Sequence, residues 1–165
     1  MKVSELMQGR TPSADYEGWI TNDDWVLAVD STGEATKVAD FTVVQMGIAG
    51  LDAQMNPVTQ DKQYIRTGQN TTKTGTQRTF KVSGDRYIGD AFQDYCFGTD
   101  ILFGTGNDVI VPYVYFNIKN GKGEKGQVSI IVNSDGGGNA GENSAIDIDL
   151  KKTGALPEAY TYSAT

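Results

Sequence analysis

Histidine is absent from the sequence, and Cys96 is the only cysteine. A single cysteine excludes a disulfide bond within the chain, and the lack of histidine excludes zinc sites built from cysteines and histidines. Serine–histidine and cysteine–histidine nucleophile pairs are excluded within this chain for the same reason. We therefore expect no catalytic site, no metal site and no cofactor.

Long apolar segments are missing as well. Hydrophobic residues make up 38% of the chain, and no run of them approaches the roughly 20 residues that span a bilayer. The first residues, MKVSELMQGR, lack the apolar core of a secretion signal. We therefore expect the protein to stay in the cytoplasm in which it is made and to have no membrane partner.

Basic residues are fewer than acidic ones, with 14 Lys and Arg against 21 Asp and Glu. The formal net charge is therefore −7, and the isoelectric point is near 4.5. An acidic surface repels the phosphates of nucleic acids, which disfavours a protein that grips DNA. Two explanations for the acidity remain. It can simply keep the protein soluble, or it can provide a surface that must not adhere to a passing polyanion.

The residues that are abundant, Thr, Ser, Asn, Gly and Asp, suit short strands and turns and predict a mainly β fold. We expect one domain over residues 23–153, between an N-terminal arm of residues 1–22 and a C-terminal arm of residues 154–165. The expected strands are Asp24–Asp30, Val38–Met46, Thr71–Ser83, Val109–Ile118, Gln127–Asn133 and Ser144–Leu150. The fourth of these is apolar on both faces, which predicts that it is covered on both sides.

One helix is expected over residues 85–97. Ile88, Phe92 and Tyr95 recur there at spacings of three and four, which predicts one apolar stripe against the sheet. Ser83 or Asp85 would cap its first turn.

Residues 47–63 predict a long loop, because Pro57 and two glycines argue against regular structure. Long loops of this kind are usually functional, and apolar side chains on them would be an aggregation risk for a permanent monomer. Aromatic side chains in the two expected arms would carry the same risk if no other subunit covered them. We therefore expect the loop and the arms to contact other subunits through Met46, Ile48, Leu51, Met55, Trp19, Tyr160 and Tyr162.

Two glycine-rich segments have only a superficial likeness to ligand-binding motifs. Residues 121–126, GKGEKG, fit the letters of a dinucleotide-binding fingerprint, but a strand follows them where the fingerprint needs a helix, so a hairpin turn is favoured. Residues 135–142, DGGGNAGE, lack the spacing of an EF-hand calcium loop and favour a flexible connection.

Asp147 and Asp149 form the clearest pair of carboxylates. They alternate with Ile146, Ile148 and Leu150, so the apolar side chains face inward and both aspartates face outward. A pair about 7 Å apart could serve a glycosidase, although that chemistry usually takes its carboxylates from different elements. A solvated strand face is favoured.

The segment Thr79–Gly98, TFKVSGDRYIGDAFQDYCFG, resembles the major tail proteins of long-tailed bacteriophages, the proteins that form the tail tube. In that family a threonine-rich strand often precedes a helix with the pattern GxRxxGDxxQD[FY]. The residues here that fit the pattern are Gly84, Arg86, Gly89, Asp90, Gln93, Asp94 and Tyr95. The opening MKVSELMQGR and the final DLKKTGALP are similar to the same group.

The resemblance implies a β-sandwich of two packed, mostly antiparallel sheets with a flanking helix, and a structural protein of the virion tail without enzymatic activity. Such proteins assemble in the host cytoplasm into hexameric rings that stack as a hollow tube. Implied partners are other copies of the chain, the tape-measure protein, and the tail terminator and distal tail proteins. DNA passes through without specific binding, and Asp147 and Asp149 become candidates for the lumen wall.

Two other classes remain open. One is a secreted adhesin or pilus-like β subunit, which also self-associates but would need a secretion signal. The other is a carbohydrate-binding β-sandwich module or small glycosidase, in which the aromatic residues and Asp147 with Asp149 would form the site.

Overall fold

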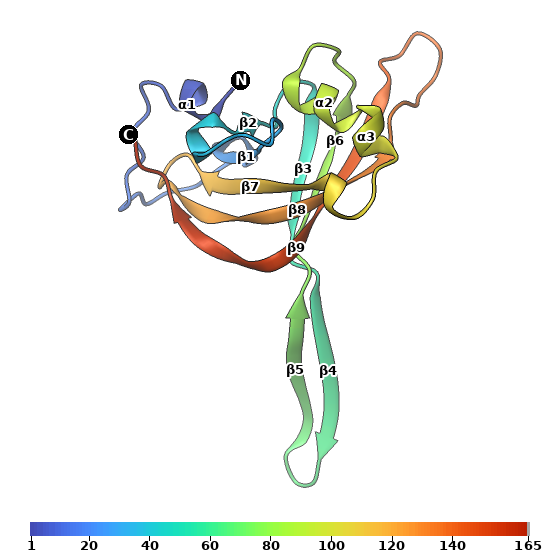
Figure 1. The fold of residues 1–165 in the computed structure, drawn as a ribbon. Coiled ribbons are helices and arrows are strands. Elements are labelled where there is room, and N and C mark those ends of the chain that lie inside the picture. The colour runs from blue at the N-terminus through green and yellow to red at the C-terminus, as the bar shows by residue number, and fades with distance from the viewer. Residues whose placement is uncertain (165) are drawn as a thin grey trace.

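A computed structural model describes residues 1–164 and shows a mainly β fold with two sheets and few helices, as predicted (Figure 1). All pairs of neighbouring strands are antiparallel. The larger sheet has seven strands, in the spatial order β2 (Thr42–Val43), β1 (Trp25–Val29), β7 (Ile110–Asn117), β8 (Lys122–Ser134), β9 (Ala145–Thr161), β6 (Thr79–Asp85) and β3 (Ile48–Gln54).

The seven-stranded sheet curls strongly, so that β3 and β6 cross over the strands at its other end (Figure 1). Phe80 of β6 packs against Tyr113 and Tyr115 of β7, with ring centroids 5.3 and 4.9 Å apart, although β8 and β9 lie between these strands in the sheet. One curled sheet therefore encloses its own main core, much as two packed sheets would.

Strand β7 is buried on both faces, as its sequence predicts. Tyr113 and Tyr115 point into the main core, while Val114 and Phe116 point to a second apolar cluster on the opposite face. The short helix α1 (Val3–Leu6) covers that second cluster with Val3, which is fully buried. Part of the expected N-terminal arm therefore belongs to the folded body.

The predicted loop over residues 47–63 is wrong. Its first part is β3, the edge strand of the large sheet, and its second part begins β4 (Pro57–Tyr64). β4 pairs with β5 (Gly68–Thr76) as a separate two-stranded sheet that extends away from the body (Figure 1). The expected single strand Thr71–Ser83 is consequently two strands, β5 and β6, with a break at residues 77 and 78.

The predicted helix over residues 85–97 is shorter in the structure, where α2 spans Ala91–Cys96 and α3 (Thr99–Leu102) follows. Gly89 has a φ of +108°, which a right-handed helix does not allow, and Asp90 caps α2 in place of Ser83 or Asp85. Phe92 is fully buried as predicted, but Ile88 lies before the helix and is 83% exposed.

Residues 154–161 are not an arm, because β9 continues through them and pairs with the start of β8. A shift of register between Lys125 and Gln127 marks the bend where this pairing resumes. Thr165, the last residue of the expected arm, lies outside the described residues. β7 and β8 pair antiparallel, so the predicted hairpin is confirmed, but residues 122–126 of the segment GKGEKG lie in β8 and the turn comes before them.

Candidate assembly surfaces

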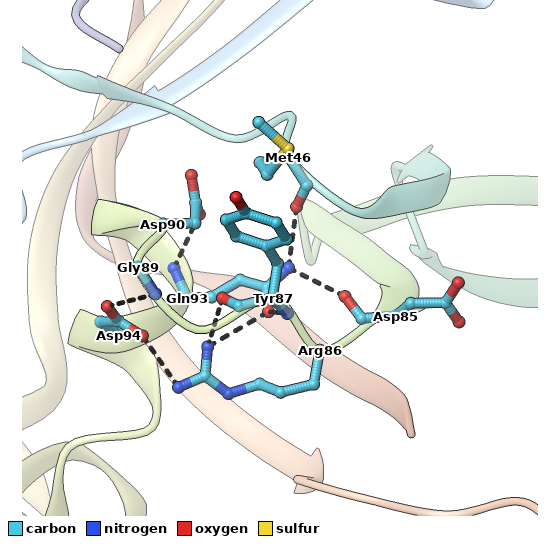
Figure 2. A network of polar contacts seen from close by, with 8 residues as sticks. All are labelled: Met46, Asp85, Arg86, Tyr87, Gly89, Asp90, Gln93 and Asp94. Carbon is cyan, nitrogen blue, oxygen red and sulfur yellow. Dashed lines mark hydrogen bonds and ion pairs between the residues drawn. The ribbon is translucent and has the colours of Figure 1, made fainter. Parts of the chain in front are cut away.

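The residues that carry the resemblance form a hydrogen-bonded clamp between α2 and the strands beside it (Figure 2). Gln93 is fully buried at its centre. Its amide nitrogen donates to the backbone carbonyls of Met46, at 2.7 Å, and Asp85, at 3.0 Å. Its amide oxygen accepts from the backbone N–H of Tyr87 at 2.8 Å. One side chain thus satisfies three backbone groups that would otherwise be costly to bury.

The charged residues of the pattern hold the turn before α2. Asp90 accepts a hydrogen bond from the Gln93 backbone N–H at 3.0 Å, which caps the helix. Asp94 accepts from the Gly89 backbone N–H and from the Arg86 guanidinium, both at 2.9 Å. These bonds hold the turn and the start of α2 in place, so the pattern acts as a structural support.

Gly84 is the first residue of the pattern. It lies where β6 and the start of β3 approach each other too closely for a side chain. A Cβ atom on Gly84 would overlap the Gly47 carbonyl and lie 2.8 Å from the backbone nitrogen of Ala49. Gly47 itself has a φ of +72°, a conformation that glycine adopts without strain. The clamp therefore fixes α2 against the first residues of β3.

The β4–β5 hairpin is exposed over almost its whole length. Every residue of β4 is exposed, and the hairpin projects from the body with solvent on both faces (Figure 1). Residues 57–76 hold one acidic side chain, Asp61, and three basic ones, Lys62, Arg66 and Lys73. The hairpin therefore has a formal charge of +2, which leaves −9 on the rest of the chain, whose total is −7.

The base of the hairpin is anchored firmly to the sheet. Arg78 forms an ion pair of 2.6 Å with Glu124 of β8 and lies over the rings of Phe80 and Tyr115. Glu124 also accepts a hydrogen bond from the Tyr113 hydroxyl. Burial, together with the Glu124 charge, raises the pKa of Tyr113, and burial raises that of Tyr115 to about 12. Both phenols therefore stay neutral beside the ion pair.

An open cleft of about 860 Å³ lies over α2 and α3. Asp94, Asp100 and Asp108 line it, and no basic residue does. Phe103, at the end of α3, is also in its lining and is 81% exposed. The cleft thus combines negative charge with an exposed aromatic ring.

The seven predicted contact residues do not form one surface. Ile48 and Leu51 lie in register with Gly84 and Val82 of β6 and pack against the core, so their expected position on an exposed loop is wrong. Met46 and Met55 are about half exposed, on either side of β3. The three aromatic candidates lie elsewhere.

Those aromatic candidates differ from one another in their surroundings. Trp19 is 97% exposed, so it has an apolar surface of the kind that marks a contact. Tyr160 and Tyr162 instead pack on Phe116 of their own chain, with ring centroids 5.8 and 5.6 Å away. Both tyrosines thus pack on their own chain, one within β9 and one just after it.

Asp147 and Asp149 lie on the outer face of β9, opposite the buried Ile146, Ile148 and Leu150. Asp149 is in register with Lys81 of β6, and Asp147 with Ser83. Lys81 therefore lies beside one of the two carboxylates, which the sequence alone did not indicate.

Further large apolar side chains that the sequence did not single out as contacts are exposed. Tyr64, Ile65, Ile88 and Phe103 lie at turns or at element ends, where hydrophobic periodicity gives no signal. Leu156 is exposed within β9.

Residues 1–164 contain no group of three His, Cys, Asp or Glu side chains placed to hold a metal ion. Within the same residues, no helix is both long and apolar enough to cross a membrane. Cys96 is fully buried, and burial raises the pKa of its thiol, which keeps the sulfur protonated.

No protein-family model matches the sequence, and no curated protein is significantly similar to it. Two of the solved structures with a similar fold come from gene transfer agent (GTA) particles. One is the tail of an empty GTA particle with C6 symmetry, with a TM-score of 0.62 at 14% identity over 88% of this chain and 100% of the other. The chain has the fold of a GTA tail protein. The other is the virion of a native GTA particle, with a TM-score of 0.55 at 14% identity over the same shares of the two chains.

This tail-protein fold confirms, at the level of the fold, the resemblance that residues 79–98 indicate. The match includes the full length of the GTA chain and 88% of this chain. The similarity therefore extends well beyond the helix that carries the sequence pattern.

Proposed function

We propose that the protein is the structural subunit of a bacteriophage-type tail tube and works by assembling with copies of itself. The observation that carries the proposal is the tail-protein fold combined with a basic hairpin that projects from an acidic body. A projecting polar hairpin with solvent on both faces contributes nothing to a core of its own chain. Its natural use is in contact with another subunit.

Six copies in each ring are the stoichiometry we propose, because the similar GTA tail has C6 symmetry. Rings that stack head to tail use two different surfaces on each subunit, and such heterologous contacts propagate into filaments. We propose that the hairpin, with Met55 at its base, and the exposed Trp19 supply part of these contacts. Each is an apolar or charged surface that its own chain leaves uncovered.

Further partners follow from this role. In a tube, the lumen holds a tape-measure protein before DNA is ejected, and the tube ends on tail terminator and distal tail proteins. We place the protein in the virion tail, after assembly in the host cytoplasm. No enzymatic reaction is part of the proposal.

Electron microscopy of the purified chain tests the proposal. A tube former gives hollow filaments of uniform width, whereas an adhesin or a carbohydrate-binding module does not.

We also propose that the face with Asp147 and Asp149 lines the lumen, where a negative wall keeps DNA from adhering. Single charges at about 10 Å are largely screened at 0.1 M salt. Charges repeated around a narrow channel sum to a stronger field. Reversing both, Asp147→Lys with Asp149→Lys, should still allow tubes to form but slow genome ejection, measured as DNA release from particles.

A matched control reverses Asp15 and Glu34, two exposed acidic residues that belong to other segments of the chain than β9. The control makes the same change in net charge and is expected to leave ejection unchanged. Normal ejection from tubes that carry the β9 reversals would place that face outside the lumen.

A further inference from the structure

The hairpin and the acidic cleft lie at opposite ends of the molecule. In Figure 1 the β4–β5 hairpin points away from the body on the side opposite α2 and α3. Eight residues of β4 span about 26 Å at the usual rise of a strand. The tip of the hairpin therefore cannot reach the cleft of its own chain, but it can reach the cleft of a copy stacked in the same orientation.

The tip has an apolar part and a charged part. Tyr64 and Ile65 end β4 and begin the turn, and Ile65 is 84% exposed. Arg66 follows in the turn with a φ of +67°, and no ion pair joins it to any residue among 1–164. Lys62 lies 5.8 Å from the centre of the Tyr64 ring, which adds a second cation beside the apolar residues.

The cleft has the complementary chemistry. Asp94 is paired with Arg86. Asp100 and Asp108 take part in no ion pair among the residues that the structure describes. Phe103 presents its ring beside these carboxylates. Opposite charges of this kind steer association and fix register, and burial of the exposed apolar side chains adds affinity.

We infer that the tip of the hairpin, Tyr64–Ile65–Arg66, docks in the α2–α3 cleft of a second copy of the chain. Arg66 faces Asp100 and Asp108, and Ile65 packs against Phe103. The inference rests on the proposed tail function and names the surface that receives the hairpin. Because tip and cleft are different surfaces at opposite ends, each copy keeps one of each free, and the contact repeats along the assembly.

Cysteine cross-linking tests this pairing directly, because the native Cys96 is buried and its raised thiol pKa keeps it unreactive. An affinity-tagged Ile65→Cys protein is mixed with an untagged Phe103→Cys protein, assembled and oxidised. The expected product is a tagged–untagged covalent dimer. Neither variant alone should give a dimer, and the tagged protein should give none with Glu34→Cys, whose cysteine stands in the exposed connection between β1 and β2.

Charge exchange gives an independent measurement. Arg66→Asp alone, and Asp100→Arg alone, are each expected to raise the concentration needed for assembly about tenfold, because each places like charges together. Combining the two changes in one chain should restore assembly toward the parent value.

The outcomes separate the inference from the proposed function. A parent protein that never assembles contradicts the tail function and this inference with it. A parent that assembles normally, but whose Ile65→Cys variant cross-links to Glu34→Cys and not to Phe103→Cys, overturns the inference alone. Failure of the combined charge exchange to restore assembly would also count against the pairing.

Discussion

Replacing residues 57–76 with two glycines is expected to give a folded, soluble monomer that no longer polymerises. The cut is compatible with the fold, because the Gln77 backbone N–H already donates to the Asn56 carbonyl, at 3.3 Å. A two-residue glycine loop can close such a pair of strands. All of β4 is exposed, so the free energy of unfolding should change by less than about 1 kcal/mol.

Assembly, by contrast, should be lost at every concentration at which the parent forms filaments, because one of the two stacking surfaces is gone. Urea unfolding measures the stability, and sedimentation measures the polymer. Thr72→Ser, a mild change on the exposed face of β5, is the control and should polymerise like the parent. Filaments from the shortened chain would show that the hairpin is not a stacking element, and a chain that fails to fold would assign the hairpin to the core.

Gln93→Leu is expected to lower the free energy of unfolding by about 4 kcal/mol. Leucine fills a similar volume, but it leaves the Met46 and Asp85 carbonyls and the Tyr87 N–H without their partner. Each buried group left unsatisfied costs about 1–3 kcal/mol. The loss should also loosen α2, whose position beside β3 depends on this side chain.

Urea denaturation of the monomer measures the effect, with Gln60→Leu on the exposed hairpin as the matched control. The control removes the same amide where solvent surrounds it, so its effect should lie within about 0.5 kcal/mol of zero. A loss for Gln93→Leu below about 1 kcal/mol would mean that the three backbone groups find other partners and that the clamp is not a support of the fold.

The parts of the fold that the sequence predicts well are those where apolar side chains alternate against a core. β7 and residues 146–150 of β9 have the expected faces because burial sets which side chains point inward. Phe92 is buried as expected for the same reason. The helix boundary was less predictable, because a single backbone angle at Gly89 moves Ile88 out of the stripe and into solvent.

Strand β4 of the hairpin shows no hydrophobic periodicity because neither of its faces is buried. Polar residues on both faces of β4 look like a loop, and Ile48 and Leu51 were assigned to that loop although β6 pairs with them. The cleft could not be predicted from the sequence either, because Asp94, Asp100 and Asp108 come together only through the turns around α3. Local charge patterns cannot reveal a surface that tertiary structure assembles.

The central claim is that this chain builds a tube from copies of itself. Negative-stain electron microscopy of the purified parent protein, imaged over a range of concentrations beside the shortened chain that lacks the hairpin, tests it most directly. The account predicts hollow filaments of uniform width for the parent and only small particles for the shortened chain. Parent protein that remains as small particles at every concentration, with no hollow filament, would contradict it.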